Sequence, residues 1–241
     1  MRGLIAGLAW ACTVAVTPVL AQEITSARYI EPTDAYGHGA VAQGEYAALE
    51  VTFSDGTRRT VRWGDAVFED TAPRLHDFDG DGGAEVITVV SDFNRGARVQ
   101  LFKATGGALS PAGANAPIGS RNRWLAIAGI ADFDGDGVEE IAYVDRPHLA
   151  KELVLLSVDV TTPAFTLSEM ARVRGLTNHH LGSAVIEGGV RHCAGTAPVV
   201  LTADGDWSHI METQVSGGVL VSTPVARYEG ASGFAPYLRC P

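Results

Sequence analysis

The sequence predicts an all-β protein assembled from repeated short strands, and three observations support this prediction. A nine-residue acidic loop at residues 77–85 occurs a second time at residues 132–140. Each copy is followed by a short run of β-branched and aromatic residues, which is typical of a strand. The chain also contains 28 glycines and 11 prolines, with few helical patterns, and this composition suits many turns between short strands.

The first 21 residues have the features of a secretory signal peptide. Arg2 precedes an apolar run that is interrupted by Thr17 and Pro18 and ends at the small residue Ala21. No later segment is apolar enough to predict a transmembrane segment. We therefore expect an exported protein, periplasmic or secreted, with residues 22–35 as an N-terminal arm and residues 36–241 as a single domain.

Four β-runs, each of which ends in Asp, divide this domain into similar units. They lie at residues 49–55, 86–92, 141–145 and 199–204. A turn and a further β-run follow each of them. This spacing is typical of a repeat protein whose units are small antiparallel sheets, and it predicts about four units.

The two acidic loops carry the ligand pattern of a hard cation. Each has carboxylates at its first, third, fifth and ninth positions, and Gly82 or Gly137 permits the sharp turn that would wrap a Ca²⁺ ion. An EF-hand would need a glutamate at position twelve and flanking helices, but that position holds Thr88 or Tyr143. A polar turn that binds no metal is the alternative.

The pattern Asp-x-Asp-Gly-Asp-Gly-x-x-Glu followed by a strand resembles the FG-GAP (VCBS-type) repeats of integrin-like β-propellers, over about residues 67–160. The resemblance implies a small β-propeller of about four blades, with structural Ca²⁺ in two of them. The other repeats lack a complete loop and so depart from the family. The family's metal ligands would correspond to Asp77, Asp79, Asp81 and Glu85 in one loop and to Asp132, Asp134, Asp136 and Glu140 in the other.

Cys193 and Cys240 are the only cysteines outside the predicted signal peptide. In an exported chain they most simply form one disulfide, which would tie the C-terminus to the last repeat. Cys193 falls where the fourth repeat would carry its acidic loop, so we expect the disulfide to replace the ion there. Two free buried thiols are the alternative.

Alternating strand directions would place the hairpin turns and the connections on the face opposite the acidic loops. Guanidinium and indole groups on that face would suit an acidic or sugar-like ligand. Alternatively, the tryptophans are core residues and the arginines form salt bridges, or the histidines form a metal or acid/base site. The ligand-binding candidates are Arg95, Arg123, Trp124, Arg146, His148, Asn178, His179 and Trp207.

The charge balance limits the partners that we expect. Acidic residues outnumber basic residues 28 to 18, which argues against nucleic acid and anionic membranes. The sequence has no nucleophile elbow, phosphate loop or zinc-protease motif. It predicts a non-catalytic binding or structural module for an extracytoplasmic protein or carbohydrate, of unknown oligomeric state. The alternative is a propeller enzyme, a carbohydrate-active hydrolase or lyase, with its site opposite the calcium loops.

Overall fold

The computed structural model describes residues 23–240, so the predicted signal peptide lies outside the described residues. The elements are almost all strands, which confirms the predicted all-β class. In chain order they are β1 (Ile24–Thr33), β2 (Glu45–Phe53), β3 (Arg58–Arg62), β4 (Ala66–Phe68), β5 (Arg74–His76), β6 (Glu85–Asp92), β7 (Gly96–Thr105), β8 (Ala108–Ala114), β9 (Leu125–Ala131), β10 (Glu140–Asp145), β11 (Glu152–Asp159), β12 (Phe165–Arg174), β13 (Leu176–Thr177), β14 (Gly189–Arg191), β15 (Val199–Asp204), β16 (His209–Ser216), β17 (Val219–Arg227) and the 3₁₀ helix η1 (Ala231–Phe234).

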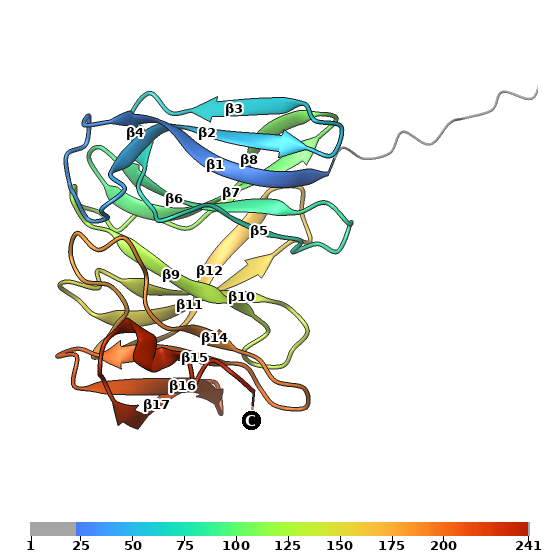
Figure 1. Ribbon diagram of the computed structural model, residues 1–241. Helices are drawn as coiled ribbons and strands as arrows, with labels where there is room; N and C mark the ends of the chain where they lie inside the picture. Colours follow the sequence, from blue (N-terminus) through green and yellow to red (C-terminus); the bar gives the residue numbers. More distant parts are fainter. Residues whose placement is uncertain (1–22, 241) are drawn as a thin grey trace, which may run out of the picture.

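Successive groups of strands are stacked along the molecule in chain order (Figure 1). Strands β1–β3 lie at one end, β5–β8 and β9–β12 follow, and β15–β17 lie at the other end. This arrangement fits a β-propeller-like fold. β1 pairs with β2, β17 pairs with β16, and these two outermost strands do not pair with each other within the described chain. The number of blades stays a prediction.

The strand pairing links the first three groups into one curled sheet. β4 pairs with both β2 and β6, and β8 pairs with β12 in the parallel direction. The sheet therefore contains 12 strands, and the last group forms a separate sheet of five. The only helix in the described chain is η1, and no described helix is long and apolar enough to cross a membrane.

The four β-runs that the sequence singles out form strands β2, β6, β10 and β15. Every residue of β6 and β10 is buried, because neighbouring sheets cover both faces of these strands. In contrast, β3 lies at an edge and exposes arginines, a composition that discourages pairing with another chain. The prediction of these strands is confirmed.

The segment predicted as an N-terminal arm, residues 22–35, contributes a strand to the first sheet. β1 pairs antiparallel with β2, with Ala27 opposite Val51 and Tyr29 opposite Leu49. The side chain of Ile24 is buried in the same apolar cluster as Leu49 and Val51. Alternate residues of this segment face the core, so it is integrated into the sheet and is not a free arm.

The apolar core lies between successive sheets. Ile87 of β6 belongs to the same buried cluster as Ile127 of β9 and Ile141 of β10. A second cluster joins Val144 of β10 to Val200 of β15. These shared cores hold the sheets face to face, which leaves the loops at both ends of the strands free to carry polar sites.

The predicted disulfide between Cys193 and Cys240 is present. Cys193 lies in the connection from β14 to β15, the position that corresponds to the acidic loops between β5 and β6 and between β9 and β10. The bond therefore ties this connection to the C-terminal segment.

Candidate metal loops and ligand face

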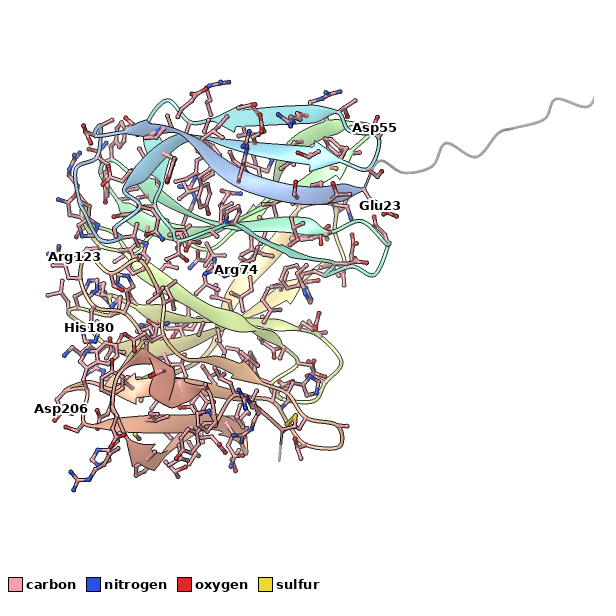
Figure 2. The ribbon with its side chains drawn as sticks, viewed as in Figure 1. Glu23, Asp55, Arg74, Arg123, His180 and Asp206 are labelled. Atoms are coloured by element: carbon pink, nitrogen blue, oxygen red, sulfur yellow. A yellow bond between two sulfur atoms is a disulfide. The ribbon has the colours of Figure 1, made fainter. Side chains whose placement is uncertain are left out.

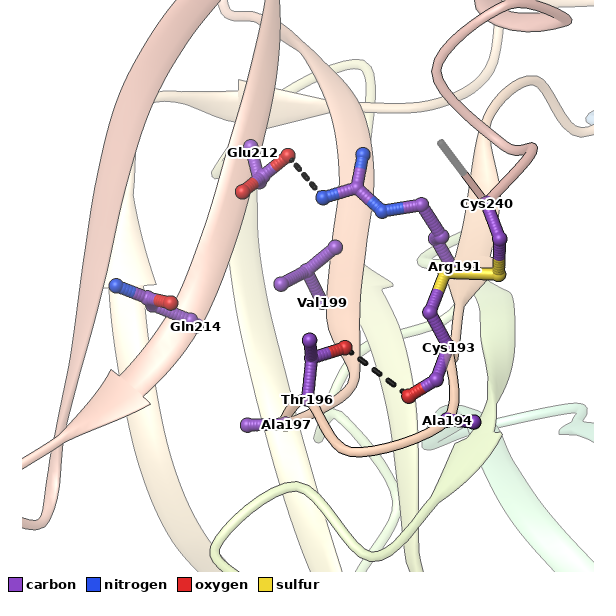
Figure 3. A pocket seen from close by; sticks show the side chains of 9 residues that line it. All are labelled: Arg191, Cys193, Ala194, Thr196, Ala197, Val199, Glu212, Gln214 and Cys240. Atoms are coloured by element: carbon purple, nitrogen blue, oxygen red, sulfur yellow. Dashed lines mark hydrogen bonds and ion pairs between the residues drawn. A yellow bond between two sulfur atoms is a disulfide. The ribbon is translucent and has the colours of Figure 1, made fainter.

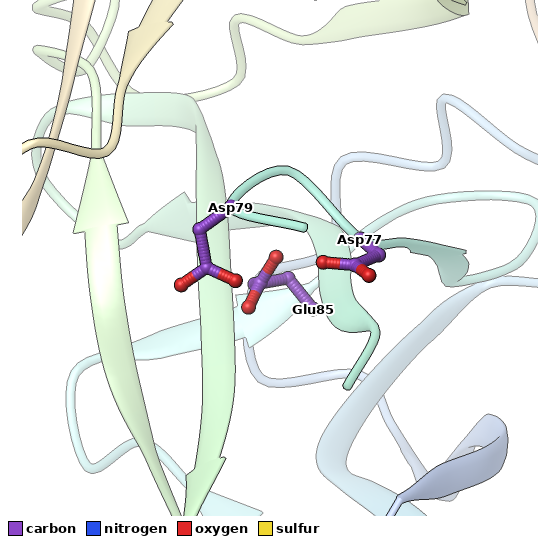
Figure 4. Close-up of side chains that lie close together, drawn as sticks. All are labelled: Asp77, Asp79 and Glu85. Atoms are coloured by element: carbon purple, nitrogen blue, oxygen red, sulfur yellow. The ribbon is translucent and has the colours of Figure 1, made fainter. Parts of the chain in front are cut away.

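The first acidic loop connects β5 to β6 and gathers three carboxylates (Figure 4). Oxygen atoms of Asp77, Asp79 and Glu85 all lie within 4.8 Å of one another, so this group could hold a metal ion. Glu85 is fully buried at the start of β6. Asp81, the remaining predicted ligand, has a side chain that is 53% exposed and lies outside the close group.

The second acidic loop connects β9 to β10 and gathers a different set of three. Oxygen atoms of Asp132, Asp134 and Asp136 lie within 4.8 Å of one another, and this group could also hold an ion. Glu140, the fourth predicted ligand, is buried at the start of β10 and accepts a hydrogen bond from the backbone N–H of Phe133 at 2.8 Å. Both sets offer oxygen atoms alone, which suits a hard cation.

The first aspartate of each loop shapes the turn. The N–H groups of Gly80 and Gly82 donate to Oδ1 and Oδ2 of Asp77 at 2.8 and 2.9 Å. In the second loop the equivalent bonds to Asp132 measure 2.7 and 3.0 Å. Gly82 and Gly137 have φ values of 88° and 89°, a left-handed conformation that favours glycine. The two loops therefore have the same backbone design.

The loops differ in the cation that accompanies them. The Nζ atom of Lys103 forms ion pairs with Asp79, with Asp81 at 2.9 Å and with Glu85 at 3.3 Å. Within residues 23–240, no basic side chain forms an ion pair with the four predicted ligands of the second loop. Lys103 was not predicted as a site residue, and no local motif marks it.

Burial raises the pKa of both glutamates, but the charges near them differ: Glu140 lies near aspartates, whereas Glu85 also lies near Lys103. Burial, together with the charges of Asp134, Asp136 and Asp132, raises the pKa of Glu140 to about 7, although the hydrogen bond from Phe133 lowers it. Burial also raises the pKa of Glu85, although Lys103 lowers it. The Oε1 atom of Glu85 is buried without a hydrogen-bond partner, so its contact with Lys103 is an ion pair only. A cation in either loop would stabilise the ionised carboxylates.

Both acidic loops lie in a segment that matches a known protein family. Residues 77–143 match the family described as FG-GAP-like repeat. The chain contains an FG-GAP-like repeat. The match runs from Asp77 in the first acidic loop to Tyr143 in β10, so it includes both loops, as the sequence predicts. No curated protein matches the chain significantly.

The acidic loops of the FG-GAP-like repeat and the ligand candidates lie at opposite ends of the strands. The connections from β5 to β6 and from β9 to β10 project to the right in Figure 1. Arg123, His180 and Asp206 lie along the left edge in Figure 2, which has the same viewpoint. We refer to this left edge as the hairpin face, because it carries the hairpins β6–β7, β10–β11 and β15–β16.

Three ligand candidates form a buried cluster at the hairpin face. Trp124 is 1% exposed and donates its indole N–H to the backbone oxygen of Glu69 at 2.6 Å, so it is a core residue. His148 Nε2 lies 3.0 Å from His179 Nδ1, and His179 Nε2 lies 3.1 Å from the carbonyl oxygen of Ser183. Because a carbonyl only accepts, His179 donates from Nε2 and accepts from His148 at Nδ1 when both rings are neutral.

The cavity beside this cluster is small. His148, Arg123 and Arg146 line it together with His38, and its volume is about 20 Å³. A cavity of this size holds about one water molecule and has no room for a sugar ring. Asn178 is buried elsewhere, where its amide donates to the backbone oxygen of Ala126 at 3.2 Å. Asn178 is therefore not among the residues that line the cavity with His148 and Arg123.

Two of the candidate arginines are engaged in salt bridges. Arg95 contacts Asp92 and Arg146 contacts Asp145, each at 2.8 Å. Each aspartate is the last residue of its strand, so these pairs fasten the hairpin turns that follow β6 and β10. For Arg95 and Arg146 the salt-bridge alternative therefore describes the structure.

Trp207 belongs to a separate aromatic group that is only partly buried. Its ring stacks on His180, with 3.7 Å between ring centroids, and lies 4.9 Å from the ring of Tyr228. Trp207 and Tyr228 line a cavity of about 440 Å³ together with Ser208, Arg227 and Glu229. Trp207 has a φ of 61°, an uncommon conformation for a bulky residue, in the turn between β15 and β16.

A larger cavity of about 520 Å³ lies beside the disulfide (Figure 3). Arg191 and Glu212, which line it, form an ion pair at 2.6 Å. Thr196 donates its hydroxyl to the backbone oxygen of Cys193 at 3.1 Å. These polar groups interact with one another, and together with the disulfide they stabilise the connection between β14 and β15.

The sequence did not predict four residues that the fold brings to these sites, namely Lys103, Tyr228, His38 and Glu69. Lys103 reaches the first acidic loop from another strand, and Tyr228 reaches Trp207 from the end of β17. Nδ1 of His38 lies 2.7 Å from a carboxylate oxygen of Glu69, the residue whose backbone oxygen accepts from Trp124. None of these residues lies in a motif, and only the pairing of distant strands brings them together.

Proposed function

We propose that the protein is a calcium-stabilised, propeller-like binding module that works outside the cytoplasm. The observation that carries this proposal is the second acidic loop, where three aspartates converge and no basic side chain of residues 23–240 forms an ion pair with them. The FG-GAP-like repeat covers both acidic loops. A disulfide and the leader-like residues 1–21 favour export.

The second loop offers a ligand set that suits Ca²⁺. Asp132, Asp134 and Asp136 would hold the ion together with Glu140, which lies at the start of β10. The ion would supply the positive charge that these carboxylates lack. It would thereby link the loop to β10, and its role would be structural, since the cavity at Trp207 lies at the opposite end of the strands.

A thermal-stability experiment tests the calcium assignment. Asp134→Ala should lower the melting temperature in calcium and weaken the response to a chelator, because ligand binding at 100 times its Kd stabilises a folded protein by about 2.7 kcal/mol. Asp34→Ala is the matched control, since Asp34 is exposed and lies in the connection from β1 to β2, outside both loops. An Asp134→Ala protein that responds to chelator like the wild type would contradict the assignment.

For the ligand we propose an extracytoplasmic carbohydrate, bound in the cavity lined by Trp207 and Tyr228. The faces of these rings can pack on a sugar ring, while Ser208, Arg227 and Glu229 can form hydrogen bonds with its hydroxyl groups. The cavity of about 440 Å³ is in the range of small-ligand sites. The strands behind the turn hold this surface rigidly.

Arrays of glycans and peptides, each probed with the purified protein, test this assignment. Trp207→Asn should abolish glycan binding without adding backbone strain, because asparagine tolerates a positive φ. Leu149→Ala is the control, since Leu149 is an exposed apolar residue of the neighbouring hairpin. Binding to peptides alone, or glycan binding that survives Trp207→Asn, would contradict the carbohydrate site.

A further inference from the structure

The ammonium group of Lys103 lies among the carboxylates of the first acidic loop. Lys103 belongs to β7, whose pairing with β6 directs its side chain toward Asp79, Asp81 and Glu85. Its side chain is only 20% exposed, and Nζ lies 5.6 Å from the ring centroid of Phe165. Packing therefore holds the ammonium in this position, as a bound ion would be held.

The ammonium group of Lys103 lies next to the buried carboxylate of Glu85. Glu85 is fully buried, and its Oε1 atom has no hydrogen-bond partner. Among the described residues, the ion pair of that oxygen is with Nζ of Lys103, at 3.3 Å. A buried carboxylate without a compensating charge is costly, so the lysine serves the purpose that a metal ion would serve.

The second acidic loop lacks this lysine at the corresponding position. Val86 pairs with Phe102 in the first repeat, and Ile141 pairs with Leu156 in the second. The residue after Phe102 is Lys103, and the residue after Leu156 is Ser157, which pairs with Glu140. Ser157 thus occupies the place of Lys103 and carries no charge.

We propose that Lys103 is a tethered cation that takes the place of a metal ion in the first acidic loop, so that the two similar loops differ in calcium binding. The second loop binds Ca²⁺, and the first is closed by its own lysine. This inference refines the two sites that the sequence predicts, and it rests on the proposed function for the second loop. A calcium ion could enter the first loop only by displacing three ion pairs at once.

Calcium titration of chelator-stripped protein by isothermal calorimetry tests the proposal. The wild type should bind one Ca²⁺ ion, and Lys103→Ser, which installs the residue found in the second repeat, should bind two. Ser157→Lys should weaken the site of the second loop at least tenfold. Two equivalent sites in the wild type, or an unchanged single site in Lys103→Ser, would overturn the proposal.

Thermal stability gives a second readout that does not depend on counting sites. Without calcium, Lys103→Ser should melt at a lower temperature than the wild type, and added calcium should raise its melting temperature by more than it does in the wild type. An equal calcium response in both proteins would refute the role of Lys103. If Lys103→Ser does not fold, Ser157→Lys decides, and wild-type affinity in Ser157→Lys overturns the proposal.

The same titrations separate this inference from the proposed function. Binding of one ion by Lys103→Ser and of none by the wild type would support the tethered lysine and contradict the calcium site in the second loop. Binding of no ion by either protein would contradict both.

Discussion

At the scale of single residues, the hairpin face depends on two neutral histidines. His179 is buried and donates to the carbonyl oxygen of Ser183, so its Nδ1 atom accepts from His148. Burial, together with the nearby His179 and His38, lowers the pKa of His148 to about 4. Burial also lowers the pKa of His179. A proton on His148 would add charge to a site that already contains Arg123 and Arg146.

This arrangement predicts that the free energy of unfolding decreases as the pH is lowered from about 6.5 to about 4. In that window the unfolded chain binds the proton that folded His148 rejects, so folding is favoured above pH 6.5 and the contribution is lost on acidification. His148→Gln should flatten the dependence by at most about 1.4 kcal/mol per pH unit. Urea unfolding of both proteins from pH 4 to pH 7 measures it.

His192→Gln is the control for this series, because His192 is exposed. It should keep the wild-type slope. If His148→Gln also keeps that slope, the histidine pair does not carry the pH dependence.

At the scale of elements, the parallel contact between β8 and β12 is the join between the second and third groups of strands. Gly113 pairs with Phe165, and Thr166 pairs with Ala114. A Cβ atom on Gly113 would lie 2.4 Å from the backbone oxygen of Phe165, a distance too short for any contact. A glycine is therefore required where the two backbones meet.

Gly113→Ala should destabilise the protein by about 1–3 kcal/mol, the usual cost of overpacking, because one of the two strands must move. Gly64→Ala is the matched control, since a Cβ at Gly64 meets no atom within 4 Å and Gly64 has no left-handed φ. Chemical denaturation of both variants gives the difference. Equal stability of the two variants would show that the β8–β12 contact yields without cost.

At the scale of the whole molecule, different devices fix the corresponding connections of the repeats. Carboxylates and Lys103 surround the loop between β5 and β6, three aspartates converge in the loop between β9 and β10, and a disulfide ties the connection between β14 and β15. Lys103 and the disulfide each fasten a polar connection, the first by its charge and the second by a covalent bond. The last group of strands depends most on this bond, because it forms a separate sheet.

Replacement of both Cys193 and Cys240 by serine should lower the free energy of unfolding by about 2–5 kcal/mol, the range found when small secreted domains lose a native disulfide. Urea denaturation of the variant and of the reduced wild type should give similar values. Intact mass after alkylation without reduction is the independent check. Alkylation of both cysteines in the wild type would contradict the bond.

Local sequence patterns are sufficient to predict the features that neighbouring residues control. The acidic loops, their left-handed glycines and the strands β6 and β10 follow from local turn chemistry and from runs of β-branched residues. The pairing of Cys193 with Cys240 is favoured because the third cysteine, Cys12, lies in the predicted signal peptide. These features need no knowledge of the rest of the fold.

The contacts between distant side chains depend on the pairing of strands in the folded protein. Lys103 enters the first acidic loop because of the register between β6 and β7, and the position of Ser157 follows from the register between β10 and β11. The contact of His148 with His179 joins residues from different connections. A shift of one residue in β7 or β11 would turn Lys103 or Ser157 to the opposite face, and the sequence patterns do not specify register with that precision.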